Sequence, residues 1–251
     1  MSAPTYDKER PETIQGLFTH IASDYDRANA IMSFSLHKWW NSTLIKKLTE
    51  RPLEGQVTLL DLCCGTGEIT KSYLKKHQNP HRVFALDFSE GMLAQAKMRL
   101  LTPEFSQHEI TCIQGDAQNI PLEKCSVDRI SVAYGIRNVR KPELCIQEAF
   151  RVLKPGGTFC ILELTRPKFP PLRFLHRTYM TYVLPLVGKL VASDKEAYEY
   201  LMNSIQGFIA PSDLAQTMSD SGFQEVQCQA LLGGIATIIQ GYKPKTLTQK
   251  V

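Results

Sequence analysis

The middle of this chain alternates short apolar runs with segments of helical periodicity, and this alternation limits the possible folds more than any other feature. The apolar runs that read as buried strands are residues 57–62, 82–86, 110–114, 127–134 and 158–164. The helical patterns between them are residues 68–77, 89–101 and 142–153. Strands that alternate with helices pair in parallel and carry helices on both faces. The sequence therefore predicts an open, mostly parallel α/β sheet.

Two stretches depart from this alternation. Residues 1–50 precede the first strand and contain two tryptophans, whereas residues 165–210 are rich in aromatic residues without a clear strand. After them come a helical pattern and two runs that read as an antiparallel strand pair joined by two glycines. We expect a single domain over residues 1–251. Its expected parts are a helical lid at 1–50, a ligand-binding core at 57–164, a helical insertion at 165–210, and a terminal helix with strand pair at 211–243.

The composition is that of an ordinary globular protein and disfavours several classes. The chain has 251 residues and a formal charge of +4, a mild excess that does not indicate nucleic-acid binding but suits an anionic membrane surface. No run is long and apolar enough to span a membrane, and the acidic N-terminal stretch lacks the features of a signal or transit peptide. The seven cysteines form no C-x-x-C pair, so we expect them to be reduced, buried and free of metal.

A glycine loop follows the first strand in the stretch "LLDLCCGTGEIT". Gly65 and Gly67 allow a sharp turn and the close approach of a ligand to the backbone. Twenty residues after Gly67, Asp87 ends the second strand, where a carboxylate can accept hydrogen bonds from both hydroxyls of an adenosine ribose. The loop and Asp87 together predict a nucleoside site.

The residues around the loop disfavour a phosphate. A dinucleotide loop has a third glycine where this chain has Thr70, and it leaves the helix N-terminus free for pyrophosphate. Here Glu68 stands at that N-terminus and Asp61 precedes the loop. Two acids favour a cationic or zwitterionic ligand such as S-adenosylmethionine and disfavour an NAD-dependent dehydrogenase. The alternative is that Glu68 complements the helix dipole while Asp61 orders the loop.

Polar residues also follow the third and fourth strands. Asp116 and the small Ala117 end the third strand, where an acid can take the exocyclic amine of adenine, although an Asx turn is the alternative. Arg137 and Asn138 follow the fourth strand, in "SVAYGIRNV". Ligands of open α/β sheets bind at the carboxyl ends of strands, so these residues belong beside the loop. A structural ion pair for Arg137 and a helix cap for Asn138 are the alternatives.

The order of the motifs DLCCGTG, ALDFSEGML, GDAQNIPL and RVLKPGG resembles the class I S-adenosylmethionine-dependent methyltransferases. This resemblance implies a Rossmann-like, mostly parallel seven-stranded sheet with an N-terminal helical lid and a helical insertion before the last strands. The cofactor contacts that it implies fall on Thr66, Asp87, Asp116 and Ala117. A serine that contacts the cofactor in some members is replaced here by Ala133, so that contact is not expected.

Further stretches resemble the ubiquinone/menaquinone C-methyltransferase family. These are YDRANAIMSFSLHKWW, YGIRNV, LELTRP and LPLVGKLVASDKEAYEYLMNSI. The resemblance implies methylation of a ring carbon of a prenylated quinol, either demethylmenaquinol or the 2-methoxy-6-polyprenyl-1,4-benzoquinol of ubiquinone synthesis. A protein that binds the cofactor without catalysis is the alternative from another class.

The implied reaction assigns roles to several residues. A quinol carbon becomes nucleophilic when its neighbouring hydroxyl loses a proton, so Arg137 would stabilise the phenolate and Asn138 would bind a quinol oxygen or a water. Tyr25 and Asp26 of the lid would close over cofactor or quinol, and His37 is a weaker candidate base. The aromatic and basic insertion would touch a membrane or form a homodimer interface. We expect a bacterial cytoplasmic enzyme, peripheral on the inner face of the membrane.

Overall fold

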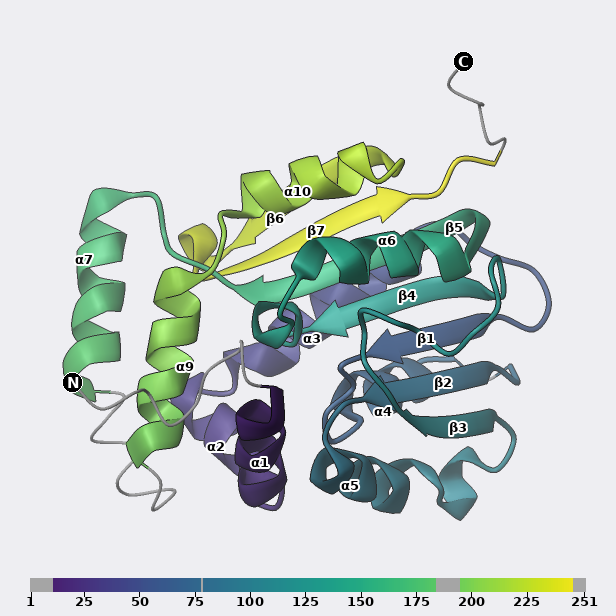
Figure 1. Cartoon of the computed structure of the whole chain (residues 1–251), viewed down its shortest axis with the longest axis horizontal. Helices are drawn as coiled ribbons and strands as arrows, with labels where there is room; N and C mark the ends of the chain where they lie inside the picture. Colours follow the sequence, from purple (N-terminus) through teal and green to yellow (C-terminus); the bar gives the residue numbers. More distant parts are fainter. Residues whose placement is uncertain (1–10, 78, 184–194, 246–251) are drawn as a thin grey trace.

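The computed structural model describes residues 11–77, 79–183 and 195–245, which form a seven-stranded sheet in the order β3-β2-β1-β4-β5-β7-β6 (Figure 1). Strand β7 pairs antiparallel with β5 and β6, and the other neighbouring pairs are parallel. The strands are β1 (Thr58–Leu62), β2 (Arg82–Asp87), β3 (Glu109–Gln114), β4 (Val127–Ala133), β5 (Leu153–Leu164), β6 (Gln224–Leu231) and β7 (Ala236–Tyr242). The predicted mostly parallel sheet is confirmed.

Helices precede, separate and follow these strands. The α-helices are α1 (Pro11–Ile21), α2 (Tyr25–Met32), α3 (Leu36–Leu48), α4 (Glu68–Leu74), α5 (Glu90–Leu100), α6 (Pro142–Val152), α7 (Pro170–Thr178), α9 (Lys195–Gly207) and α10 (Pro211–Asp220). The short helices are η1 (Pro103–Phe105), η2 (Ile136–Asn138), the π-helical turn η3 (Tyr179–Val183) and η4 (Leu232–Gly234). Residues 184–194 of the predicted insertion lie outside the described part of the chain.

Alternating side chains of the strands bury both faces of the sheet. On β1, Leu60 packs in one cluster with Ile146 of α6 and Leu214 of α10, while Leu59 packs in another with Leu44 of α3. Each of these side chains is fully buried, which stabilises the fold by about 1.5–3 kcal/mol per residue. Helices on both faces leave the edge formed by the strand ends as the place for a ligand.

Two details differ from the prediction. Strand β5 begins at Leu153, which pairs with Val127 of β4, rather than at residue 158. The register of this pairing with β4 shifts across the Lys-Pro-Gly-Gly segment that follows Leu153. The expectation that the cysteines are buried is wrong for Cys125 and Cys228. Cys125 lies in a turn with a left-handed backbone (φ 55°), and Cys228 lies on β6, a mostly exposed edge strand.

The N-terminal helices and the insertion gather at the carboxyl ends of β1 and β4. Figure 1 shows α1, α2, α7 and α9 beyond the arrowheads of these strands. The hydroxyl of Tyr179 in η3 donates to the carbonyl of Met32 in α2 (2.6 Å), so the two regions are in direct contact. Among the described residues, no helix has the length and apolar character needed to cross a membrane.

Candidate active site

The loop after β1 has an unusual backbone. Cys63, Gly65 and Gly67 all have positive φ values, of 54°, 54° and 80°. A Cβ on Gly67 would lie 2.9 Å from Cδ1 of Leu100, whereas a Cβ on Gly65 would meet no atom within 4 Å. The first glycine therefore faces open space beside the loop, and the second allows close packing against α5.

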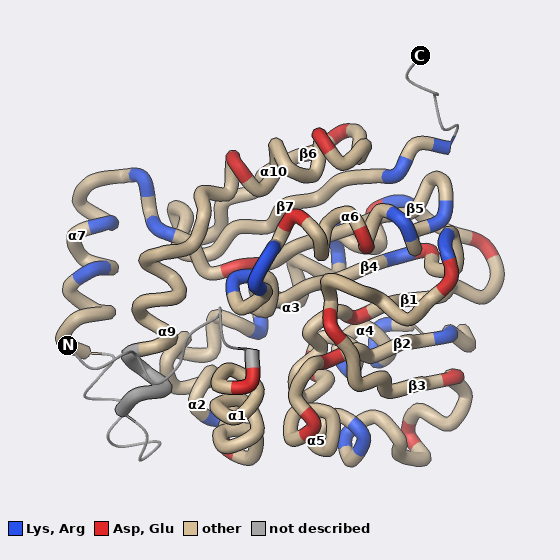
Figure 2. The backbone as a smooth tube through the Cα atoms, in the orientation of Figure 1, with Lys and Arg blue, Asp and Glu red and all other residues tan. Residues whose placement is uncertain are grey.

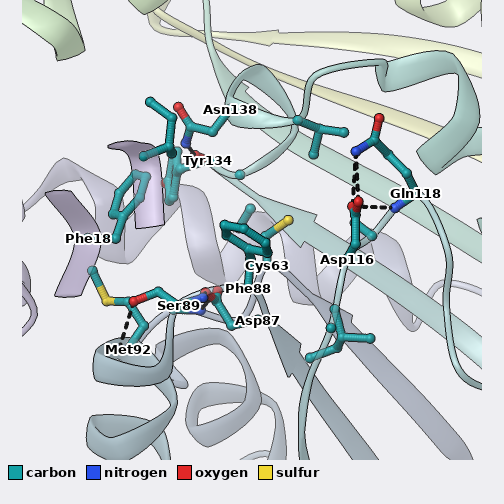
Figure 3. Close-up of a pocket in the computed structure, with 18 of the residues that line it drawn as sticks. Phe18, Cys63, Asp87, Phe88, Ser89, Met92, Asp116, Gln118, Tyr134 and Asn138 are labelled. Atoms are coloured by element: carbon teal, nitrogen blue, oxygen red, sulfur yellow. Dashed lines mark hydrogen bonds between the residues drawn. The ribbon is translucent and has the colours of Figure 1, made fainter. Parts of the chain in front are cut away.

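Asp87 sits at the base of a cleft formed by this loop and the end of β2 (Figure 3). Its two carboxylate oxygens accept from the backbone N–H groups of Gly65 (2.8 Å) and Ser89 (2.9 Å). Burial raises the pKa of Asp87, and these two bonds oppose the rise. Each carboxylate oxygen has a further lone pair, so the side chain can still accept from two hydroxyl groups.

Asp116 and Ala117 form the neighbouring wall of the cleft. Asp116 accepts from the backbone N–H of Gln118 (2.9 Å) and from its amide Nε2 (3.0 Å), which is the Asx-turn geometry named as the alternative. The turn does not remove Asp116 from the cleft, because Asp116 is one of the residues that line it (Figure 3). Both interpretations of this residue therefore fit the structure.

The cleft itself is narrow, with a volume of about 120 Å³. Apolar side chains close it, with Phe88 and Met92 beside Asp87 and Phe18 reaching in from α1. Apolar walls with a few convergent carboxylates suit a nucleoside. The open space at Gly65, the lone pairs of Asp87 and these walls fit the adenosine half of S-adenosylmethionine.

A second, larger cavity of about 740 Å³ adjoins this cleft. Five residues line both spaces and form a shared wall, which consists of Tyr25, Cys63, Gly65, Ala133 and Tyr134. The apolar part of the lining comes from the N-terminal helices, the insertion and the strand ends, and includes Met32, Trp40, Leu164, Leu172, Met180 and Ile205. Phe34 and Leu175 also line this cavity although they are 72% and 64% exposed, so they mark its mouth.

Tyr25 and Asp26, which were predicted to belong to a lid, lie in α2 beside these two spaces. Tyr25 lines both spaces, and burial raises the pKa of its hydroxyl. Asp26 accepts from the hydroxyl of Thr66 in the glycine loop (2.8 Å). Farther along the large cavity, Nδ1 of His37 lies 2.7 Å from the hydroxyl oxygen of Ser33, and burial lowers the pKa of His37.

Arg99 of α5 also belongs to this site, although the sequence did not indicate it. Its guanidinium forms an ion pair with Asp26 and another with Glu68 (3.0 Å), and it donates to the hydroxyl of Thr66 (3.1 Å). A single arginine in a surface helix carries no pattern that marks it as a site residue. Only the packing of α5 against the loop brings it here.

Arg137 is almost fully buried and pairs with Glu163 of β5, with Nη1 2.5 Å from Oε1. Nη1 also donates to the carbonyl of Tyr134 (2.6 Å). Burial alone would lower the pKa of Arg137, but Glu163 outweighs it and the pKa is raised, so the side chain stays cationic. Glu163 was missed, although a charged residue inside the apolar run 158–164 demands a buried partner and was a usable signal.

Two features of Arg137 bear on a ligand-binding role. It lines the large cavity, and its Nε is buried without a hydrogen-bond partner among the described residues. A buried N–H without a partner costs free energy until an acceptor binds it. The structural ion pair and a ligand-binding role are therefore compatible for this arginine.

Asn138 faces the narrow cleft rather than the large cavity. Its Oδ1 accepts from the hydroxyl of Tyr200 in α9 (2.8 Å), and its Nδ2 lies 3.5 Å from the carbonyl of Tyr134. Helix α6 takes Lys141 as its N-cap residue, so Asn138 does not cap that helix. Its predicted role toward the quinol stays a prediction.

Asp61 supports the loop from behind. Its oxygens accept from the hydroxyls of Thr70 (2.7 Å) and Ser131 (2.8 Å), and burial raises its pKa to about 6. Thr70, which stands where a dinucleotide loop has its third glycine, is thus a partner of Asp61. Asp61 also reaches the lining of the large cavity. No three potential metal ligands gather in the described part of the chain.

Strand β7 is reversed between β5 and β6, and acids at the end of β2 and just after β3 lie beside a glycine loop. This arrangement is that of a class I methyltransferase. Such an enzyme takes its methyl group from S-adenosylmethionine. This chain belongs to the ubiE/COQ5 methyltransferase family, whose model matches residues 6–243.

Individual proteins agree with this assignment. The chain is 43% identical to a demethylmenaquinone methyltransferase of Protochlamydia amoebophila over 96% of this chain and 98% of that protein. It is 34% identical to a demethylmenaquinone methyltransferase of Staphylococcus aureus over 97% of this chain and 98% of that protein. A SAM-dependent methyltransferase from Thermotoga maritima shares the fold, with a TM-score of 0.59 and 20% identity over 91% of this chain and 99% of that one.

Proposed function

We propose that this protein methylates a ring carbon of demethylmenaquinol to give menaquinol. The observation that carries the proposal is the large apolar cavity that shares a wall with the cofactor cleft. Its volume of about 740 Å³ is within the range of small-molecule sites, and its apolar lining suits a fused aromatic ring with part of a prenyl tail. The names of the two relatives at 43% and 34% identity support the same substrate.

In this proposal, S-adenosylmethionine supplies an electrophilic methyl group on its sulfonium. Asp87 would hold its ribose and Asp116 with Ala117 its adenine, while Gly65, Thr66 and Gly67 would lie against the rest. The shared wall of Tyr25, Cys63, Gly65, Ala133 and Tyr134 is the place where cleft and cavity meet, so the ring carbon would have to reach it. Holding the quinol there in one orientation supplies several kcal/mol of the barrier reduction.

Arg137 would stabilise the negative charge that develops when the quinol hydroxyl loses its proton. The support is its buried Nε–H, which has no partner among the described residues, and its place in the cavity lining. A positioned donor of this kind contributes about 100-fold or more to the rate of reactions through an oxyanion. A water bound to the arginine would accept the proton. Asn138 would then act through its bond to Tyr200, by fixing α9 over the site.

An assay with radiolabelled S-adenosylmethionine and short-chain quinols tests this function. We expect label on demethylmenaquinol, whereas label only on the 2-methoxy-6-polyprenyl-1,4-benzoquinol would assign the protein to ubiquinone synthesis. Tight cofactor binding without label on either quinol would identify a non-catalytic protein. Arg137→Ala should lose turnover and keep cofactor affinity. Arg137→Lys keeps the positive charge without the Nε–H, so we expect it to fold normally and to lose roughly 100-fold in turnover.

The mouth of the cavity supports membrane contact through α7. Residues 164–183 contain four basic residues and no acidic one, and Figure 2 shows α7 with blue segments and no red. Phe169, Phe174 and Tyr182 are 64%, 74% and 73% exposed. Exposed aromatic rings beside basic residues suit an anionic lipid surface, from which a prenylated quinol could enter.

Charge reversal tests this contact. The double substitution Arg173→Glu/Arg177→Glu should weaken co-sedimentation with anionic vesicles by roughly tenfold or more, because each basic residue near such a surface contributes about 1 kcal/mol. Substitution of the exposed Lys46 and Lys124 by glutamate changes the total charge by the same amount and is the matched control. Binding that survives the reversal unchanged would contradict the proposal. A monomer–dimer shift in light scattering would instead assign this face to a homodimer.

A further inference from the structure

Arg99 joins three parts of the chain at the edge of the large cavity. From α5 it reaches Asp26 in α2, Thr66 in the glycine loop and Glu68 at the start of α4. Its side chain is 22% exposed and it lines the large cavity together with these three residues. The arginine therefore sits beside the glycine loop without being sealed behind it.

The bonds of Arg99 leave part of its guanidinium unused. Nη1 donates to Thr66 and Glu68, and Nη2 donates to Asp26. A guanidinium has five N–H groups, and Arg99 uses three of them in its bonds to the described side chains. The two that remain, the Nε–H and one N–H of Nη2, can donate to the two oxygens of a carboxylate.

The charges around Arg99 also suit a zwitterion. Two carboxylates, those of Asp26 and Glu68, surround one guanidinium. The amino-acid end of S-adenosylmethionine carries one carboxylate and one ammonium group. The unused fork of the arginine would receive the carboxylate, and the remaining lone pairs of the two acids would receive the ammonium.

We propose that Arg99 is a cofactor-binding residue that recognises the carboxylate of the amino-acid end of S-adenosylmethionine. Its ion pair with Asp26 at the same time holds α2 against the glycine loop, so recognition of the cofactor and placement of the lid depend on one side chain. Binding of the methyl donor by Arg99 does not depend on which quinol is the acceptor.

Two ligands that differ in the amino-acid end separate this role from a purely structural one. S-adenosylhomocysteine has the full amino-acid end, and 5′-methylthioadenosine has the adenosine and thioether without it. In calorimetric titrations we expect Arg99→Gln to lower the affinity for S-adenosylhomocysteine by roughly tenfold or more. The affinity for methylthioadenosine should stay unchanged. Arg99→Lys keeps the charge but loses the fork, so it should show a smaller loss with the same selectivity.

Lys97 provides the matched control, because it is exposed on the same helix and Lys97→Gln removes the same charge. This control should bind both ligands like the wild type. Equal losses for both ligands in the Arg99 variants would mean that the arginine only positions the lid, and unchanged affinity would mean that it has no part in binding. Either result overturns the proposal. Thermal melting shows whether each variant is folded, and Arg99→Lys keeps the test available if Arg99→Gln is not.

Discussion

Replacing Glu163 by glutamine tests the buried pair beneath the large cavity. The glutamine keeps a side-chain oxygen for the backbone N–H of Leu164, which lies 2.8 Å from the carboxylate. It removes the negative charge that faces Arg137, whose side chain is 5% exposed against 2% for Glu163. The guanidinium would then remain as a buried cation without a counter-ion among the described residues. Removing one partner of such a pair costs about 3–5 kcal/mol.

This cost converts to a large change in melting temperature. A domain of this size loses about 2–4 °C per kcal/mol, so Glu163→Gln should melt roughly 6–20 °C below the wild type. Differential scanning calorimetry and urea denaturation measure both quantities. Turnover should fall with stability, because the arginine that faces the cavity loses the group that orients it.

A double-mutant cycle provides the control. Arg137→Met/Glu163→Gln removes both charges, and replacing a buried ion pair by groups without charge is often nearly neutral. The double variant should therefore recover most of the lost stability while remaining inactive. Two results would refute the reasoning. One is a Glu163→Gln variant with the same melting temperature as the wild type. The other is a double variant whose loss of stability equals the sum of the losses of the two single variants.

Three further substitutions test other parts of the fold. Gly135→Ala would place a Cβ 2.2 Å from Cβ of Cys63, so it should lower the free energy of unfolding by about 1–3 kcal/mol. It should also weaken the binding of S-adenosylhomocysteine, and an unchanged affinity in calorimetry would contradict this. Burial lowers the pKa of His81 in the folded protein, so the unfolded protein binds a proton at this residue at higher pH than the folded protein does. The free energy of unfolding therefore falls as the pH drops below about 6.5. His81→Phe should flatten this pH dependence in urea titrations, and an unchanged slope would count against it. Lys243→Met should cost about 1–3 kcal/mol in melting experiments, because Nζ donates to the carbonyl of Phe150 (2.6 Å) and to the buried carbonyl of Leu153 (2.7 Å).

The fold could be predicted because its signal is local. Each strand of the core is a short apolar run, each helix has its own periodicity, and the order of the two fixes a parallel sheet. Parallel strands bring their carboxyl ends to one edge, so Asp87 and Asp116 could be placed beside the glycine loop without knowledge of any distance. The structure places both in one cleft with Gly65.

The partners of those residues could not be predicted in the same way. Arg99 reaches Asp26 across 73 positions of the sequence, and nothing in helix α5 distinguishes it from a solvated arginine. Tyr200 bonds to Asn138 through the fold of the insertion, which has no strand pattern to fix its place. Contacts of this kind depend on how helices outside the sheet pack, and periodicity gives no information about that packing.

The backbone at the end of β4 explains how Arg137 is held where a buried apolar run ends. Tyr134 ends that run with a left-handed backbone (φ 57°), and Cys63 across the site has the same conformation (φ 54°). Such conformations cost of order 1–3 kcal/mol each in non-glycine residues and persist where surrounding contacts enforce them. Here the enforced turn directs the carbonyl of Tyr134 to Nη1 of Arg137 (2.6 Å).

Both strained residues belong to the wall that the cofactor cleft and the large cavity share. Gly135 lets them approach, because any side chain there would overlap Cys63. The strain therefore fixes the arginine and the shared wall relative to each other before a quinol binds. The methyl transfer proposed across that wall needs such a fixed arrangement more than it needs a reactive side chain, since the donor already carries the reactive group.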